Sequence, residues 1–186
     1  VDRTIYNEFC DRLVSVVQQY RLGDPLDPNT TMGPMVNVAA AEQVRAQIEQ
    51  AVSLGAVAKI NPDDFSLNRP GTAYLAPQVL TEVNHSMAVM TEESFGPVIG
   101  VMPVDSDQQA IALMNDSDFG LTASIWSENE AKSLAIAECL ETGTVFMNRC
   151  DFLDPALAWV GVKQSGRGCA LSTLGYEQLT RPKSFH

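Results

Sequence analysis

Two segments near the start of the chain place apolar residues at the spacing of an amphipathic α-helix. In the first segment, one side of the predicted helix carries Ile5, Phe9, Leu13, Val16, Val17 and Tyr20, and the pattern breaks at "GDPLDP". In the second segment, residues 38–54, the repeating apolar positions are Val44, Ile48, Ala51 and Val52. Asn37 is suited to cap the second helix and Gly55 to end it.

Five short apolar runs predict strands between and after the helices. In chain order they are "AVAKI", "YLAPQVLTEV", "VIGVMPV", "LTASIWS" and "GTVFMN". Pro77 lies inside the second run, and because proline has no amide hydrogen it predicts an edge strand or a bulge. The third run predicts a buried strand.

Two further helices separate the last three predicted strands. One is expected from Asp105 to Asn115, and the other begins at an S-x-x-E capping box formed by Ser127 and Glu130. The second continues through Leu134 and ends at Gly143. Strands that alternate with helices predict an α/β layered fold with a largely parallel sheet. The length of 186 residues suits one domain, or one domain with a small appendage.

The net charge of the chain limits the kinds of molecule that it is expected to bind. The chain has 12 Lys and Arg residues against 23 Asp and Glu residues, and its formal net charge is −11. An acidic chain of this kind is not expected to bind a phosphate backbone or an anionic membrane. No apolar stretch reaches the roughly 18 residues that a membrane span needs, and no signal-peptide pattern is present.

The four cysteines favour free thiols over a disulfide framework. Cys10, Cys139, Cys150 and Cys169 are irregularly and mostly widely spaced, without a C-x-x-C pair. This pattern indicates a reducing compartment, and we expect a cytoplasmic protein. The histidines, His85 and His186, form no ligand cluster with the cysteines, so a metal site is not expected.

Candidate chemistry is expected in loops, because ligands of open α/β sheets collect beyond the carboxyl ends of strands. The loops in question are residues 90–97, 148–160 and 163–169. The first contains "MTEESFGPVIG". A carboxylate there can accept two hydrogen bonds from vicinal hydroxyls such as those of a ribose, and a nearby aromatic ring can lie against a flat heterocycle.

Five motifs in order resemble the NAD(P)-dependent aldehyde dehydrogenase superfamily over nearly the whole chain. They are "GDPLDPNTTMGPMV", "EESFGPV", "NDSDFGLTASIWS", "ETGTVFMN" and "GVKQSGRG". Any one of them could arise by chance, but five at compatible spacings make the resemblance specific. It implies a three-layer fold with a largely parallel twisted sheet and flanking helices, as in the catalytic domain of that family.

The resemblance also implies roles for single residues. Glu93 would bind the hydroxyls of the nicotinamide ribose and Phe95 would pack near the nicotinamide ring, whereas Glu92 is expected to be a surface or ion-pair residue. The loop between Asn148 and Lys163 would line an aldehyde tunnel. Its candidate contacts, for which simple hydrophobic packing is an equal alternative, are Cys150, Phe152, Leu153 and Trp159.

Part of this loop departs from the family pattern, with Trp159 and Val160 where many members carry Phe-Gly. The preferred aldehyde therefore stays open. Further along, Gly166 and Gly168 are expected to serve a tight turn, and Lys163 and Ser165 to serve the structure.

Residues 1–186 lack the family segments that carry the nucleophilic cysteine, the general base, the oxyanion-hole asparagine and the Gly-rich cofactor domain. We therefore expect a partial catalytic domain that is inactive alone, from an enzyme that oxidises an aldehyde through a thiohemiacetal and a thioester. Cys10 and Cys139 are interpreted as small core residues, and Cys150 has no histidine or evident base beside it.

The resemblance implies NAD or NADP as cofactor, a small aldehyde as substrate and a homo-oligomeric parent protein. Two alternatives remain open. One is a non-catalytic module of the same fold that serves binding or assembly, and the other is an acylating or semialdehyde-specific relative.

Overall fold

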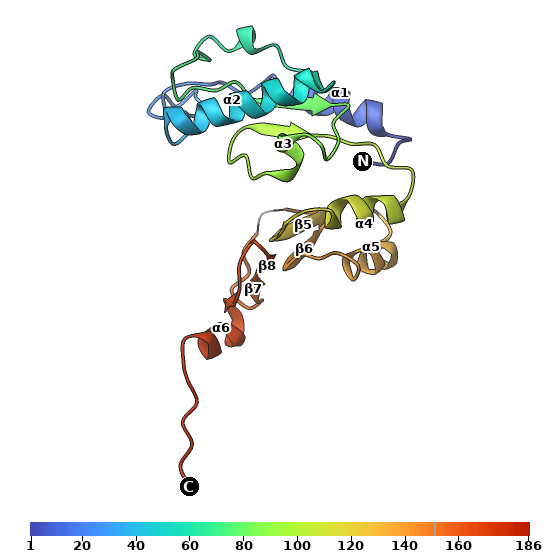
Figure 1. The fold of residues 1–186 in the computed structure, drawn as a ribbon, viewed down its shortest axis with the longest axis vertical. Coiled ribbons are helices and arrows are strands. Elements are labelled where there is room, and N and C mark those ends of the chain that lie inside the picture. Colours follow the sequence, from blue (N-terminus) through green and yellow to red (C-terminus); the bar gives the residue numbers. More distant parts are fainter. Residues whose placement is uncertain (151) are drawn as a thin grey trace. The chain divides into compact units, whose positions relative to one another are not determined.

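The computed structural model describes residues 1–150 and 152–186. These residues form two compact units, Val1–Asp105 and Ser106–His186, and Figure 1 labels several of their elements. Both units combine helices and strands, so the prediction of an α/β fold is confirmed.

The first unit is built on a three-stranded sheet. Its helices are α1 (Tyr6–Val17), α2 (Val38–Ser53) and α3 (Ala88–Thr91), with a 3-10 turn, η1 (Pro62–Asp64). Its strands are β1 (Val57–Ala58), β2 (Gln78–Thr81) and β3 (Val98–Gly100), in the order β1-β2-β3. Strand β2 runs antiparallel to β1 and parallel to β3, with Val79 opposite Ile99.

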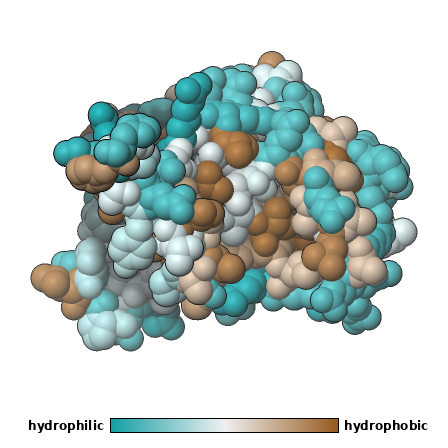
Figure 2. Space-filling view, turned by 90° about the horizontal axis from the view of Figure 1, so that it is seen from below, coloured by the Kyte–Doolittle hydropathy of each residue, from teal (hydrophilic) through white to brown (hydrophobic). Residues whose placement is uncertain are grey.

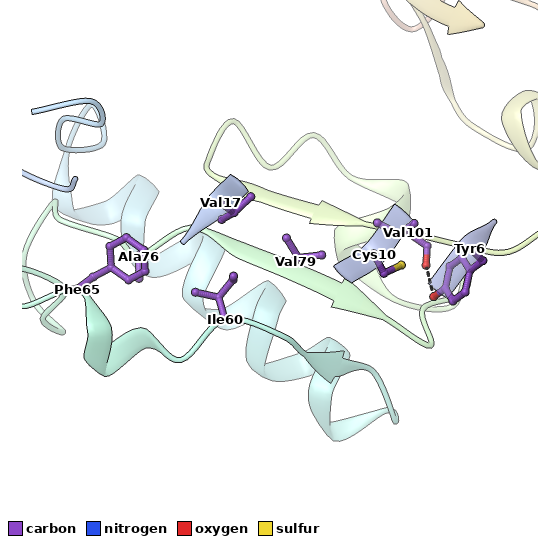
Figure 3. Close-up of a cluster of buried hydrophobic side chains, with 8 residues drawn as sticks. All are labelled: Tyr6, Cys10, Val17, Ile60, Phe65, Ala76, Val79 and Val101. Atoms are coloured by element: carbon purple, nitrogen blue, oxygen red, sulfur yellow. Dashed lines mark hydrogen bonds between the residues drawn. The ribbon is translucent and has the colours of Figure 1, made fainter. Parts of the chain in front are cut away.

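Helices α1 and α2 cover opposite faces of this sheet. Successive residues of a strand point to opposite faces. Val79 packs with Tyr6, Cys10 and Val17 of α1 (Figure 3), whereas Leu80 packs with Ala51 of α2. The unit therefore has three layers, helix, sheet and helix, with a core on each side of β2.

The second unit contains short paired strands. Its helices are α4 (Asp107–Asn115), α5 (Glu130–Ala137) and α6 (Ser172–Gln178). Its strands are β4 (Phe119–Gly120), β5 (Thr122–Ile125), β6 (Thr144–Met147), β7 (Trp159–Val160), β8 (Val162–Lys163) and β9 (Cys169–Ala170). Strands β5 and β6 are parallel over four residue pairs. The pairs β4–β8 and β7–β9 are antiparallel.

Three local predictions were wrong in an informative way. Pro77 does not mark an edge strand, because β2 lies in the centre of its sheet and begins one residue after the proline. The missing amide therefore interrupts no ladder, and the amide of Gln78 donates to the carbonyl of Pro97 at 2.8 Å. Helix α1 forms as predicted, but of the predicted apolar side only Val17 is buried and Leu13 packs against the core. The other members, Ile5, Phe9, Val16 and Tyr20, are exposed, and the helix buries Tyr6 and Cys10 instead.

The third wrong prediction concerns the start and end of α5. Its N-cap is Asn129, whose Oδ1 accepts from the amide of Lys132 at 2.9 Å, and not Ser127. The Ser127 hydroxyl instead accepts from the amide of Asn129 at 3.1 Å. The helix ends at Ala137, so Cys139 lies beyond it and is exposed, whereas Cys10 is buried as predicted.

Large apolar side chains reach the surface of both units. Examples are Ile5 and Ile99 in the first unit and Trp126 and Leu157 in the second. Figure 2 shows such apolar groups as brown areas between hydrophilic ones. Among the helices of the described residues, none combines the length and apolar character needed to cross a bilayer.

Candidate functional site

The loop at residues 92–97 connects α3 to β3 and is held firmly at both ends. At its start, the amide of Glu92 donates to the carbonyl of Ala88 at 2.8 Å. At its end, the carbonyl of Pro97 accepts from the amide of Gln78, the first residue of β2. The loop thus lies at the amino ends of the parallel strands β2 and β3. Its location differs from the carboxyl-end position that we expected, because the loop enters β3 and does not leave it.

The two carboxylates of this loop have different surroundings. Glu92 accepts a hydrogen bond at 3.1 Å from Nε2 of Gln47, a residue of α2 that is only 5% exposed. Glu93 is exposed, and within the described residues its side chain makes no hydrogen bond or ion pair. Glu92 therefore ties the loop to α2, and the Glu93 carboxylate remains available to a ligand.

Phe95 stands out from the loop with its ring in solvent. Its side chain is 85% exposed. Its backbone φ of 46° lies in the left-handed region, which is energetically unfavourable for any residue other than glycine. Gly96 follows it at a close approach to α2, because a Cβ there would lie 2.8 Å from Cγ2 of Val44. The backbone is thus packed against the unit while the ring points away from its core.

The second candidate loop begins at the carboxyl end of β6. Its first residue, Asn148, continues the β5–β6 ladder by donating its amide to the carbonyl of Ile125 at 2.9 Å. The Asn148 side chain then makes two bonds to Ser127, accepting from its amide and donating to its carbonyl, both at 2.9 Å. This reciprocal pair fixes the direction in which the loop leaves the sheet.

The four predicted tunnel residues all lie on this loop or on the strand that ends it. Cys150, Phe152 and Leu153 are exposed, and the ring of Phe152 lies 4.0 Å from the guanidinium carbon of Arg149. Trp159 is half-buried at the start of β7 and lines a hollow of about 470 Å³ together with Leu121 and the glycine turn at residues 166–168. Asp151 of the same loop lies outside the described residues.

The predicted site residues are divided between the two units. Glu93 and Phe95 belong to the first unit, whereas Cys150, Phe152, Leu153 and Trp159 belong to the second. Within the described residues, no group of three or more His, Cys, Asp or Glu side chains is arranged to hold a metal ion.

The segment at residues 163–168 has structural contacts, in line with its predicted role. Nζ of Lys163 donates to the carbonyls of Asn115 and Ser117 at 2.7 and 2.9 Å and pairs with Glu141 at 2.7 Å. Oγ of Ser165 accepts from the amide of Gly120 at 2.9 Å. The turn that follows contains two glycines with positive φ, 128° at residue 166 and 88° at residue 168, a conformation that favours glycine.

Sequence reasoning missed two residues that shape the loops. Gln47 looks like an ordinary member of an amphipathic helix, and its partner Glu92 is 45 positions away, so no local pattern could reveal the contact. Arg149 directly follows the "GTVFMN" strand. Its position next to the predicted tunnel residues was the feature of the sequence that could have identified Arg149 as part of this loop.

Comparisons with known proteins agree on one family. The model of the "Aldehyde dehydrogenase family" matches residues 1–185. A succinate-semialdehyde dehydrogenase [NADP(+)] from Mycobacterium leprae is 35% identical over 183 residues, which cover 97% of this chain and 39% of that protein. A succinate-semialdehyde dehydrogenase [NADP(+)] 1 from Mycobacterium tuberculosis is also 35% identical, over 99% of this chain and 40% of the relative.

Solved structures give the same answer. An aldehyde dehydrogenase from Bacillus cereus matches with a TM-score of 0.90 and 32% identity over 97% of this chain and 36% of that one. A betaine aldehyde dehydrogenase from Staphylococcus aureus in complex with NAD+ matches with a TM-score of 0.84 and 31% identity over 95% of this chain and 35% of that one. The chain thus spans about two fifths of the length of these curated relatives. The family match over residues 1–185, together with these identities, shows that the chain belongs to the aldehyde dehydrogenase family.

Proposed function

We propose that these residues are part of an NAD(P)-dependent aldehyde dehydrogenase and supply contacts to the nicotinamide ribose and to the aldehyde. The observation that carries the proposal is the loop at residues 92–97. It is tied down at both ends, yet it presents an unpaired carboxylate at Glu93 and an 85% exposed ring at Phe95. The positive φ of Phe95 supports a ligand contact, because strained backbone conformations cluster at ligand-binding sites.

The residues of the loop fit the nicotinamide end of a dinucleotide. The two oxygens of Glu93 can accept from the two vicinal hydroxyls of a ribose, and the Phe95 ring can lie against the nicotinamide. When bound, the cofactor supplies hydride-acceptor chemistry. The contribution of this chain is to orient the ribose through Glu93 and to limit the movement of the ring through Phe95. The names of the relatives, which specify NADP(+) or a complex with NAD+, support a nicotinamide cofactor.

The loop that follows β6 is proposed to line the path of the aldehyde. Phe152, Leu153 and Trp159 offer apolar walls of the kind that enclose small carbonyl compounds, and Cys150 would add a thiol to that wall. The named relatives differ in their aldehydes, since succinate semialdehyde carries a negative charge and betaine aldehyde a positive one. The charge near this loop is therefore the property that should decide the aldehyde class.

Further parts of the proposal follow from the family. Residues 1–186 are proposed to be a partial catalytic domain that is inactive on its own, because the segments that would carry the nucleophile and general base are not among them. A cytoplasmic, homo-oligomeric parent protein is proposed on the same grounds.

The test is the rate of cofactor reduction by the full-length protein that contains this chain, with NAD or NADP and a panel of aldehydes. We expect turnover by the wild-type protein and a large loss in Glu93→Gln, which keeps the shape of the side chain and removes its charge. Hydrogen bonds to charged groups contribute about 1.5–3 kcal/mol, so kcat/KM should fall by about 10-fold to 100-fold.

Glu92→Gln is the matched control. It changes the neighbouring carboxylate, whose partner is Gln47, and it should retain most of the activity. Equal losses in the two variants would refute a specific ribose contact at Glu93. A well-folded wild-type protein without turnover of any aldehyde would instead support the non-catalytic module.

A further inference from the structure

We propose that Arg149 binds an anionic group of the substrate and makes carboxylated aldehydes the preferred substrate class. The inference rests on the proposed function, because it assigns a role within the same aldehyde loop. It is carried by three observations: the backbone of Arg149 is fixed, its guanidinium is held by an aromatic ring, and it has no acidic partner within the described residues.

The backbone at Arg149 is fixed to the β5–β6 sheet. The carbonyl of Arg149 accepts a hydrogen bond from Oγ of Ser124, a residue of β5. The preceding residue, Asn148, donates its backbone amide to the carbonyl of Ile125, and its side chain makes two hydrogen bonds to the backbone of Ser127. A group carried by such an anchored segment can be placed accurately, as a binding residue requires.

The side chain of Arg149 is held by Phe152. The guanidinium carbon lies 4.0 Å from the centroid of the ring. A guanidinium that stacks on an aromatic face keeps the donors at its edge free, and this edge matches both oxygens of a carboxylate. The stacking therefore orders the group without consuming the donors that would bind a substrate.

Several other basic residues of the chain have acidic or backbone partners within the fold. In the second unit, Lys132 pairs with Asp107 and Lys163 pairs with Glu141. In the first unit, Arg45 binds Glu42 and several backbone carbonyls. Arg149, in contrast, makes no hydrogen bond or ion pair through its side chain with any described residue. Its exposed charge is available to a ligand.

Residues 1–186 carry an excess of negative charge, which opposes the approach of an anionic substrate. A chain with a formal net charge of −11 repels anions, and exposed charges act over about 8–10 Å at moderate salt. A fixed guanidinium on the aldehyde loop would offset this repulsion locally. The same guanidinium would disfavour an aldehyde that carries a positive charge.

The experiment compares three aldehydes of different charge in the full-length enzyme: succinate semialdehyde (anionic), butanal (neutral) and betaine aldehyde (cationic). We expect the wild-type enzyme to prefer the anionic aldehyde. Arg149→Gln should lower kcat/KM for succinate semialdehyde by about 10-fold to 100-fold, mainly through KM, because charge-assisted bonds are lost. The value for butanal should change by less than about 3-fold, and Arg149→Glu should raise the relative rate with betaine aldehyde.

Two controls separate recognition from folding. Arg149→Lys keeps the charge but loses the planar fork, so it should recover part of the preference for the anion. Arg21→Gln, which removes an exposed arginine of the first unit, should leave all three rates unchanged.

Arg149→Gln overturns the inference if it lowers the rates with all three aldehydes equally, which would indicate a structural role, or if it changes none of them. Turnover of butanal in every variant keeps this test separate from that of the proposed function. A wild-type enzyme that is inactive with all three aldehydes would overturn the proposed function and this inference with it.

Discussion

Single residues of this chain show the difference between a side chain that stabilises the fold and one that is proposed to contact a ligand. Tyr6 and Phe95 are both aromatic, but Tyr6 is 9% exposed and donates its hydroxyl to the carbonyl of Val101 at 3.1 Å. Phe95 is 85% exposed and adopts a backbone conformation that is unfavourable for a residue with a side chain. Burial with a satisfied hydroxyl stabilises the fold, whereas exposure combined with strain does not.

Tyr6 gives the chain a dependence of stability on alkaline pH. Burial raises the pKa of Tyr6 to about 12, and the neighbouring Cys10 adds to the shift. An unfolded tyrosine titrates near pH 10. Because the folded pKa is the higher one, the stabilisation is fully present below about pH 10 and is lost as the pH rises through about 12. Tyr6→Phe should therefore unfold with a weaker pH dependence in this alkaline range, as measured by denaturant unfolding of the full-length protein.

At neutral pH the same variant should lose about 0.5–1.5 kcal/mol, because the carbonyl of Val101 loses its donor. Tyr20→Phe removes an exposed phenol near the end of α1 and should leave the unfolding midpoint unchanged. An alkaline pH dependence in Tyr6→Phe as steep as in the wild-type protein would disprove the role of this hydroxyl.

At the scale of elements, the sequence predicted the helices and caps that depend on residues close to one another along the chain. The helical spacing predicted α1, α2 and α4, and Asn37 caps α2 as expected by accepting from the amide of Ala40 at 2.8 Å. The buried face of α1 was predicted poorly, because that helix carries apolar residues on two sides and only the position of β2 selects the side with Cys10. The central position of β2 was missed for the same reason, since strand order depends on pairing with β3, 20 positions away at Gln78–Val98.

Sequence motifs identified the candidate residues, but the sequence did not predict which residues they contact. The "EESFGPV" motif pointed to Glu93 and Phe95, yet the distinct surroundings of Glu92 and Glu93 depend on Gln47 in a different helix. In the same way, the stacking of Arg149 on Phe152 depends on the path of the loop and not on its composition.

The start of α5 gives a testable prediction, because the sequence pattern predicts Ser127 as the N-cap and the structure has Asn129 in that position. Asn129 accepts from the amide of Lys132, so Asn129→Ala should destabilise the protein by about 1 kcal/mol. Glu130→Ala would disrupt a capping box, but the structure shows no such box, so it should change stability by less than about 0.5 kcal/mol. Denaturant unfolding of the two variants distinguishes these possibilities. A larger loss in Glu130→Ala than in Asn129→Ala would restore the capping box at Ser127.

At the scale of the whole molecule, the two units differ in how much they bury. The first unit contains three clusters of buried apolar residues, around Val79, Leu80 and Val44. In the second unit, the buried apolar residues of the described chain are Ala123 and Leu140. Stability varies along a chain with the number of buried contacts, so the loop that follows β6 belongs to the less tightly packed unit. Such a loop is suited to adapt to a substrate, whereas the loop at residues 92–97 is part of the better packed unit.

Hydrogen exchange of the full-length protein, with and without NAD or NADP, tests the proposed cofactor contact at residues 93–96. The amides of residues 93–96 make no hydrogen bond within the described residues, so they should exchange rapidly in the free protein. Because the cofactor is proposed to lie against Glu93 and Phe95, its binding should slow exchange at residues 93–96. The loop at residues 66–71 of the same unit has no proposed ligand and should exchange at an unchanged rate. Equal slowing in both loops would indicate general stabilisation of the unit, and no slowing at residues 93–96 would contradict a cofactor contact there.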